Sequence, residues 1–207
     1  MQPRESRVID HRQALNIQRA VSHATKIGRE LNTSVTFNVG HMRCSEFAMS
    51  AMFEKLRDNH FTKWLRDMAK RNGTRAWTPA YYVWAIEGTT GHPNIHWLVH
   101  VPPAIKKQFK TKLDQWMTRL AGPLNTDQKP ILVKEAYDPM GAALYLLKGT
   151  NPRYSRKYRI RTSPQGLVYG KRAGVSASLG PTARARSVVA AFPLARKPIT
   201  GSRESRD

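Results

Sequence analysis

The sequence contains a single cysteine, Cys44, in 207 residues. One thiol cannot form an internal disulfide or a cysteine-based zinc site, so the stability of the chain must come from packing, and a reducing compartment is expected. Apolar runs of about 18 residues are also missing, and the opening MQPRESRVIDHRQ lacks the apolar core of a secretory signal. We therefore expect a soluble, cytoplasmic protein.

Acidic residues are scarce. The chain has 14 Asp and Glu against 35 Lys and Arg, which gives a net charge of +21 and a pI near 10.8. This excess is far beyond what solubility requires and indicates a polyanionic partner, with nucleic acid as the first choice. A merely well-solvated surface is the alternative, although such surfaces usually mix both signs. An acidic membrane is favoured less, because no clean basic amphipathic anchor or lipidation motif is present.

The length and the apolar content, 40%, suit one ordinary domain with tails. Residues 1–30 are polar with scattered apolar positions, and we expect an N-terminal arm or a peripheral helix there. Residues 31–175 carry the strong hydrophobic patterns and are expected to form the domain. Residues 176–207 are basic and poor in apolar clusters, which predicts a disordered tail.

Strands and helices alternate in the pattern of the domain. Runs with period two, bounded by turn residues, predict strands, whereas apolar residues three or four apart predict helices. The helical stretch after Ser45 is one long helix or two helices broken near Asn59. The connection GTTGHP makes two of the strands a hairpin. The expected strands are residues 33–39, 80–87, 94–101, 129–137 and a last one around 165–170, and the expected helices are residues 45–71, 102–121 and 138–149.

Polar groups gather at one end of this hairpin. In the second strand, Asn94, His96 and His100 share a face, and Glu87 ends the partner strand. A carboxylate and an imidazole brought together there can hold a divalent metal, with Asn94 or His92 as an available third group. The alternative is that His96 and His100 are half-buried sheet residues satisfied by their neighbours.

A second group of reactive side chains lies in the helix expected at 138–149. Asp138 can cap this helix, Pro139 can begin it and Gly149 can end it. Tyr145 and Lys148 are three residues apart and therefore share a face. A tyrosine can attack a phosphodiester covalently, and an adjacent lysine or a metal can balance the developing negative charge. A tyrosine packed at a helix edge beside a solvated lysine is the alternative.

Taken in chain order, these features resemble the HUH endonucleases, and among them the Rep-type initiators of rolling-circle replication. The resemblance covers residues 33–149, in the order strand, long helix, strand ending in Glu87, strand with the histidine motif, helix, strand, and helix with YxxK. It implies an α+β fold in which an antiparallel sheet of about five strands carries helices on its faces. The implied activity is that of a metal-dependent endonuclease and strand transferase with a tyrosine nucleophile.

The motifs transfer residue by residue. The third motif of the family, YxxK, matches Tyr145 and Lys148, which the resemblance assigns to catalysis. The second motif is histidine, hydrophobe, histidine, and here it reads NIH, with Asn94 in place of the first histidine and His96 as the second. An acidic residue seven positions before that first histidine is a common third metal ligand in Rep-type domains. Glu87 stands at this distance from Asn94.

The replacement at Asn94 leaves three possibilities open. The amide oxygen can ligate Mg²⁺ or Mn²⁺, the expected cofactor, because both ions favour oxygen donors. Alternatively, His92 or His100 supplies the missing nitrogen. In the third case the site is inactive, and the chain is a Rep-like protein that only binds nucleic acid.

The expected function is to start rolling-circle replication of a plasmid, phage or related mobile element in a bacterial or phage context. The protein would nick and rejoin single-stranded or hairpin DNA at an origin through a tyrosyl-DNA link. No P-loop is present in the sequence, so a host helicase and a polymerase are expected partners, and no membrane is involved. The residues expected to follow the DNA backbone are Arg153, Arg156, Lys157, Arg159, Arg161, Lys171 and Arg172.

Overall fold

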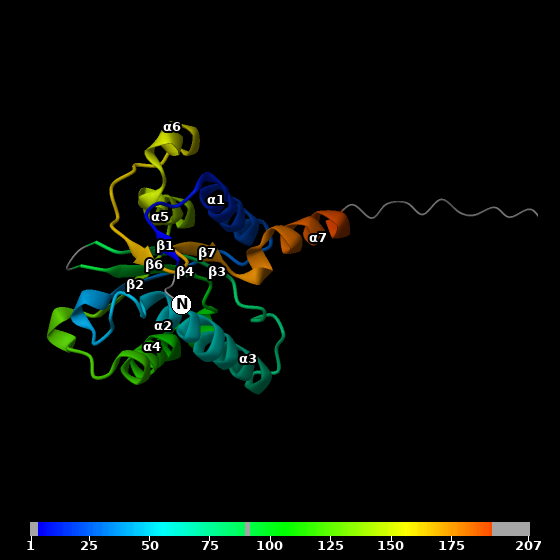
Figure 1. Ribbon diagram of the computed structural model, residues 1–207. Helices are drawn as coiled ribbons and strands as arrows, with labels where there is room; N and C mark the ends of the chain where they lie inside the picture. The colour runs from blue at the N-terminus through cyan, green and yellow to red at the C-terminus, as the bar shows by residue number, and fades with distance from the viewer. Residues whose placement is uncertain (1–3, 90–91, 192–207) are drawn as a thin grey trace, which may run out of the picture.

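A five-stranded antiparallel sheet with helices on both faces forms the centre of the molecule (Figure 1). The computed structural model describes residues 4–89 and 92–191. The strand order is β5-β2-β4-β3-β7, and a separate two-stranded ribbon pairs β1 with β6. This arrangement confirms the predicted α+β fold. The strands are β1 (Glu5–Ser6), β2 (Thr33–Asn38), β3 (Tyr82–Glu87), β4 (Asn94–Val99), β5 (Ile131–Glu135), β6 (Val168–Tyr169) and β7 (Ala173–Val175).

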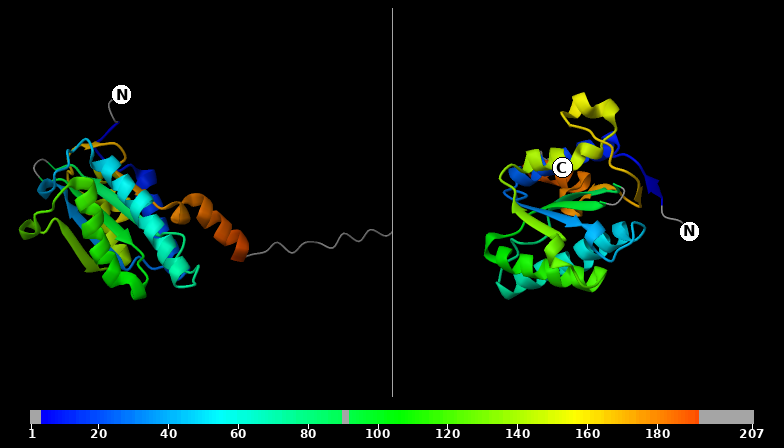
Figure 2. Two further views of the ribbon diagram at one scale, coloured as in Figure 1. Left: turned by 90° about the horizontal axis from the view of Figure 1, so that it is seen from below. Right: turned by 90° about the vertical axis from the view of Figure 1, so that its left-hand side faces the viewer.

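The helices divide between the two faces of the sheet. Figures 1 and 2 show α2, α3 and α4 on one face, and α1 and α5 on the other. The helices are α1 (His11–Lys26), α2 (Met49–Glu54), α3 (Thr62–Arg71), α4 (Lys106–Ala121), α5 (Pro139–Leu146), α6 (Ser155–Tyr158) and α7 (Pro181–Ala191). Sheet and helices alternate as three layers, so the central strands are covered on both sides.

The helical stretch expected at residues 45–71 is continuous from α2 to α3. A π-helical segment, Lys55–Phe61, joins the two and spans Asn59. The Arg57 carbonyl accepts two hydrogen bonds at the end of this segment, one from the backbone N–H of Thr62 and one from the Thr62 hydroxyl at 2.8 Å. The sequence left open one helix or two, and the structure contains one helical path with a π segment.

An aromatic cluster forms the core between the sheet and α2, α3 and α4. Trp97, in the middle of β4, packs edge-on against Phe61 and Phe53, with ring centroids 4.9 Å and 5.8 Å away. Phe37 of β2 and Phe109 of α4 complete the cluster. Because alternate residues of β4 point to the same face, this packing directs His96 to the opposite face, where the functional residues were predicted.

Helix α1 packs in the core on that opposite face, against α5 and the sheet. Asp10 accepts a hydrogen bond from the backbone of Gln13, and the Gln13 side chain accepts one from the backbone of Asp10, so a capping box begins the helix. The helix expected in residues 1–30 is therefore present and packed against the domain, and the alternative of a loosely held arm is wrong for these residues. The sequence signal was the apolar stripe of α1, whose buried members are Ala14, Ile17, Ala20, Val21 and Ala24.

Residues 4–10, here called the N-terminal strap, tie two distant segments together. The backbone of Arg4 accepts a hydrogen bond from Gly170, and Ile9 exchanges backbone hydrogen bonds with Gly149 and Asn151. The strand expected around 165–170 exists as β6, but it pairs with β1 instead of joining the main sheet. The fifth strand of the sheet is β7, which the sequence analysis missed.

The chain from 176 onward is ordered as far as the structure describes it. Leu179 is buried in a short turn, Ala177–Leu179, and α7 follows from Pro181. The Arg184 side chain donates hydrogen bonds to Leu179 and to Asn16 of α1. The predicted disordered tail is therefore wrong for residues 176–191, and residues 192–207 lie outside the described part. Within residues 4–89 and 92–191, none of the helices has the length and apolar content needed to cross a membrane.

Candidate active site

The β3–β4 hairpin sets the positions of the predicted metal ligands. Its register pairs Glu87 directly with Asn94, so both side chains lie on the same face, near the turn. His96 is two residues further along β4 and therefore also lies on this face. On the other side of β4, Asn38 pairs with Asn94 and Thr36 pairs with His96. Backbone pairing alone thus aligns a row of polar groups across three strands.

Helix α5 brings the predicted nucleophile to the same row. Asp138 caps the helix by accepting a hydrogen bond from the Gly141 backbone, and Pro139 occupies the first turn, as predicted. The buried face of α5 packs on the sheet and α1, which turns Tyr145 towards β4. The Tyr145 and His96 rings meet edge to face, with centroids 5.5 Å apart.

Four side chains from three separate segments are in contact here. The Oε1 atom of Glu87 lies 2.8 Å from Nε2 of His96 and 2.8 Å from Nζ of Lys148. Lys148 also donates a hydrogen bond to the phenol oxygen of Tyr145 at 2.9 Å. Glu87 is 5% exposed and His96 is 7% exposed, whereas Tyr145 is 56% exposed. The phenol is therefore open to a polymeric ligand, while the groups behind it are shielded from water.

The charges of this cluster stabilise one another. Burial acts to raise the pKa of the Glu87 carboxyl, but the close contacts with His96 and Lys148 outweigh burial and hold the pKa below its usual value. Burial acts to lower the pKa of Lys148, and the contacts with Glu87 and Tyr145 outweigh it, so this pKa is raised. At neutral pH, Glu87 is a carboxylate and Lys148 is an ammonium group beside the phenol.

The cluster lines an open cavity of about 430 Å³, here called the site cavity. Sequence reasoning missed several of its walls, most of all Thr36, whose hydroxyl lies 3.1 Å from Nδ1 of His96 and fixes the orientation of the ring. The signal was present in the alternation of Ser34, Thr36 and Asn38 along β2, which puts three polar side chains on one face. Lys134 of β5 lines the cavity as well.

Two donor atoms at this site fit a divalent cation. Both atoms are buried, and among the described residues their 2.8 Å contacts, from Oε1 of Glu87 to Nε2 of His96 and to Nζ of Lys148, are ion-pair contacts without hydrogen-bond geometry. Neighbouring ligands of an octahedral Mg²⁺ with bonds of about 2.1 Å lie about 3 Å apart, close to the 2.8 Å between these two atoms. Asn94 lines the same cavity, and because its amide nitrogen donates to the His92 carbonyl, its oxygen is the atom left for a ligand.

This set differs from a site made only of strong metal ligands. Within residues 4–89 and 92–191, no group of three or more His, Cys, Asp or Glu side chains could hold a metal ion. A cation here would depend on Glu87, His96 and the amide of Asn94. Such a mixed oxygen and nitrogen set suits Mg²⁺ or Mn²⁺ better than a softer metal.

The other two histidines do not join the cluster. His100 follows the far end of β4, where its Nδ1 lies 2.8 Å from the Glu30 carbonyl, so its prediction as a supporting ligand is wrong. His92 is exposed and does not line the site cavity. The structure therefore does not support the possibility that His92 or His100 supplies the ligand nitrogen that is lost at Asn94.

The predicted DNA-binding residues divide into two groups. Arg153, Arg156, Lys157, Arg159 and Arg161 are all exposed, in and around α6. Lys171 is exposed as well.

Arg172 does not belong to this exposed surface, because it is 1% exposed. Its guanidinium donates hydrogen bonds to the carbonyls of Ser6, Gly166 and Gln165. Its prediction as a residue that follows the DNA backbone on the surface is wrong, because the side chain fastens the strap to the 165–166 loop.

Comparison of the chain with protein-family models, curated proteins and solved structures found no match. Functional inference therefore depends on the geometry of the site itself.

Proposed function

We propose that the protein nicks and rejoins single-stranded DNA through Tyr145 and so starts rolling-circle replication of a mobile element. The observation that carries this proposal is the contact chain from Tyr145 through Lys148 to Glu87 and His96. These residues were selected from the sequence by chemistry, and they meet in one open cavity. A tyrosine that only packs at a helix edge has no need of a buried ion pair behind its hydroxyl.

Tyr145 is the nucleophile in this proposal. Its phenol oxygen attacks phosphorus, the bond to the 3′ oxygen breaks, and a 5′-phosphotyrosyl link and a free 3′ hydroxyl result. The phenol proton passes to solvent, and the leaving oxygen takes a proton from solvent. Lys148 stabilises the phenolate through its hydrogen bond to this oxygen, and Glu87 holds Lys148 in place. Attack by the 3′ hydroxyl on the phosphotyrosine reverses the reaction and rejoins the strand.

Glu87, His96 and Asn94 would hold a Mg²⁺ or Mn²⁺ ion. When bound, the ion would supply Lewis-acid polarisation of the scissile phosphate. Thr36 keeps the His96 ring in the orientation that directs Nε2 towards Glu87.

The exposed basic residues around α6 support the choice of DNA as the substrate. Figure 1 shows α6 beyond α5, the helix that carries Tyr145. A strand bound at Tyr145 would therefore have cations within reach on that side, and its binding would weaken with salt. The proposal also includes the form of the substrate, the partners and the location. The origin is single-stranded or hairpin DNA, a host helicase and a polymerase complete replication, and the protein acts in the cytoplasm.

A covalent-adduct assay tests the function. The parent protein and Tyr145→Phe are incubated with a labelled hairpin oligonucleotide and Mn²⁺, and denaturing electrophoresis detects covalently attached label. We expect an adduct with the parent and none with the variant. Tyr137→Phe is the matched control, because Tyr137 is exposed but does not line the site cavity. Binding without an adduct in any of the three proteins would indicate the inactive, nucleic-acid-binding alternative and overturn the proposal.

A further inference from the structure

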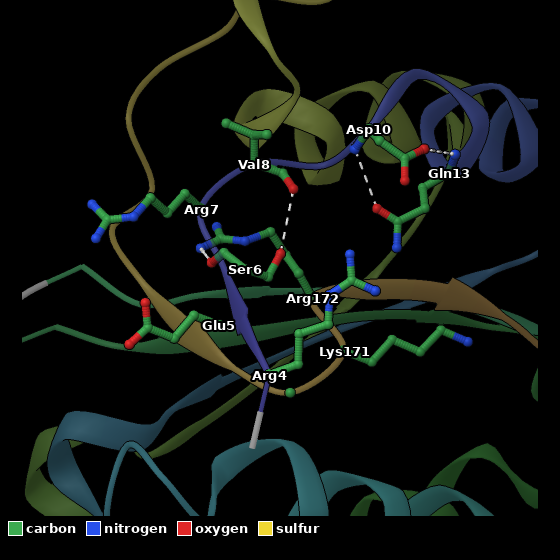
Figure 3. Close-up of a pocket in the computed structure, with 10 residues that line it drawn as sticks. Arg4, Glu5, Ser6, Arg7, Val8, Asp10, Gln13, Lys171 and Arg172 are labelled. Carbon is green, nitrogen blue, oxygen red and sulfur yellow. Dashed lines mark hydrogen bonds between the residues drawn. The ribbon is translucent and has the colours of Figure 1, made fainter. Parts of the chain in front are cut away.

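A second cavity, of about 590 Å³, lies between the N-terminal strap, the first turn of α1 and residues 170–172 (Figure 3). It is called the basic cavity here, because Arg4, Lys171 and Arg172 are among the residues that line it. The proposed function makes no use of it.

Hydrogen-bond donors face this cavity. Figure 3 shows the Arg4 guanidinium, the Gln13 amide and the Lys171 side chain around the same space. The Gln13 oxygen accepts a hydrogen bond from the Asp10 backbone, so its amide nitrogen is the part that it offers to a ligand. Arg172 stands in the wall and adds positive charge, and its Nε has no hydrogen-bond partner among the described residues.

The cations of the cavity outnumber its acidic residues, Glu5 and Asp10. Asp10 keeps its negative charge, but one of its oxygens is held at the start of α1, where it accepts a hydrogen bond from the Gln13 backbone at 2.8 Å. Glu5 extends to the opposite side of β1 from Arg4, beside Arg7, because successive residues of a strand point to opposite sides (Figure 3). The space between Arg4 and Lys171 is therefore suited to an anion with several acceptor oxygens, such as a phosphate group.

An aromatic pair of half-buried Tyr169 and exposed Phe47 adjoins the basic cavity. Tyr169 pairs with Glu5 in the β1–β6 ribbon and immediately precedes Gly170, which lines the cavity. The Tyr169 ring lies 4.2 Å from the ring of Phe47, centroid to centroid, and Phe47 is 62% exposed. A basic cavity beside an exposed aromatic ring offers the two kinds of contact that a single-stranded nucleic acid uses, cations for its phosphates and aromatic rings on which its bases stack.

A third cavity, of about 450 Å³, leads from the basic cavity towards the proposed nicking site. It shares Arg7 and Val8 with the basic cavity, and it is also lined by Gly149, the chain neighbour of Lys148 in the site cavity. On the sheet side, the Gly88 backbone pairs with Gly166 and donates to the Gln165 carbonyl, and Gly88 follows Glu87. Arg172 binds the same 165–166 loop.

We propose that the basic cavity binds a backbone phosphate of single-stranded nucleic acid, with a neighbouring base stacked on Phe47 and Tyr169. This inference deepens the proposed function and depends on it for the choice of DNA, because it adds a second contact for the strand that is held at Tyr145. Arg4 and Lys171 bind the phosphate, Gln13 donates a hydrogen bond to it, and Arg172 holds the strap that carries Arg4.

The test uses the full chain with Tyr145→Phe throughout, so that only reversible binding is measured. Fluorescence anisotropy gives the affinity for a labelled single-stranded oligonucleotide over a range of salt concentrations. The test variant carries Arg4→Gln and Lys171→Gln. The control carries Arg66→Gln and Lys70→Gln, which remove the same charge from exposed positions of α3, on the other face of the sheet. Circular dichroism checks that all the variants are folded.

We expect the test variant to bind about tenfold more weakly than the control, and its salt slope to fall by about 0.7 for the lost phosphate contact. Phe47→Ala should weaken oligonucleotide binding about five- to tenfold, in line with the loss of one stacked base, without changing the salt slope. Equal losses in the test and control variants would overturn the inference. A second pair of results would also overturn it: millimolar inorganic phosphate displaces the oligonucleotide, and Phe47→Ala binds the oligonucleotide as tightly as the parent. Together these results would indicate a site for free phosphate.

Failure of this inference and failure of the proposed function give different results. An adduct at Tyr145 together with unchanged binding by the test variant refutes the basic cavity alone. Weakened binding by the test variant without any adduct from the parent supports the cavity and refutes the nicking activity.

Discussion

Lys148 makes two contacts with the same ammonium group, one with the Glu87 carboxylate and one with the Tyr145 hydroxyl. In this structure it neutralises a carboxylate that would also hold a divalent ion. In the proposed reaction, a cation at Glu87 and the ammonium group would repel each other, while the phenolate would be stabilised by the same ammonium group. Metal binding and activation of the nucleophile would therefore place opposite demands on this residue.

Lys148→Met should separate the two effects. We expect Mn²⁺ affinity to rise on the order of tenfold, because a competing charge close to Glu87 is lost. We expect the rate of adduct formation to fall about a hundredfold, because the donor to the phenol oxygen is lost. Calorimetric titration with Mn²⁺ and the adduct assay give the two readouts.

Lys134→Met is the matched control, since Lys134 lines the same cavity from β5, where it is exposed. Weaker Mn²⁺ binding by Lys148→Met than by this control would contradict the assignment.

At the scale of elements, β2 positions the site through Thr36. Its hydroxyl contacts Nδ1 of His96, and β2 and β4 are in register at this pair. We expect Thr36→Val to lower the adduct rate and the Mn²⁺ affinity tenfold or more, as is typical when the partner of a ligating histidine is lost. The free energy of unfolding should fall by about 1–3 kcal/mol, because the substitution keeps the shape of the side chain but leaves Nδ1 of the buried His96 without its partner.

Two variants distinguish positioning from a general effect on the sheet. Thr36→Ser restores the hydroxyl and should recover most of the activity. Ser34→Ala removes a hydroxyl from the same face of β2 and should behave like the parent protein. Full activity in Thr36→Val would show that His96 needs no help from β2.

The strap and the 165–172 segment are held together by Arg172, a buried cation that donates to three carbonyls. Arg172→Met should lower the free energy of unfolding by about 2–4 kcal/mol, because buried carbonyls of the strap and the loop lose charge-assisted hydrogen bonds. Urea denaturation measures the change, and Lys171→Met, at an exposed position, should stay within about 0.5 kcal/mol of the parent. An equally small effect of Arg172→Met would show that this side chain does not anchor the strap.

The features that could be predicted from the sequence are those set by residues close together in the chain. The hairpin of β3 and β4, the register of Glu87 with Asn94, and the capped helix with Tyr145 all depend on residues near one another in the chain. The strap, β7 and α7 depend on contacts between distant segments, such as the one from Arg172 to Ser6. Arg172 looked like one more basic surface residue, because composition does not tell a buried arginine from a solvated one.

At the scale of the whole molecule, three histidines make the fold sensitive to acid. Burial, followed by nearby cations, lowers the pKa of His23 and His60. Burial is also the largest influence on His100, whose pKa is lowered despite its contact with the Glu30 carbonyl. The unfolded chain takes up protons at the usual histidine pKa near 6.5, so the folded state loses stability as the pH falls below that value.

We therefore expect a smaller free energy of unfolding at pH 5.5 than at pH 7.5, measured by urea denaturation at constant ionic strength. His100→Gln, which does not titrate, should reduce the difference between the two values. A fold that is more stable at pH 5.5 would contradict the direction of these pKa shifts.

The most direct test of the central claim is to map the covalent attachment site by mass spectrometry. The protein is incubated with a single-stranded origin-like hairpin and Mn²⁺, digested with nuclease and protease, and searched for a nucleotide-modified peptide. The account predicts a 5′-phosphate linked to Tyr145, in the peptide that also contains Lys148. Attachment at another tyrosine, or no attachment to any hairpin under conditions where the protein binds DNA, would contradict it.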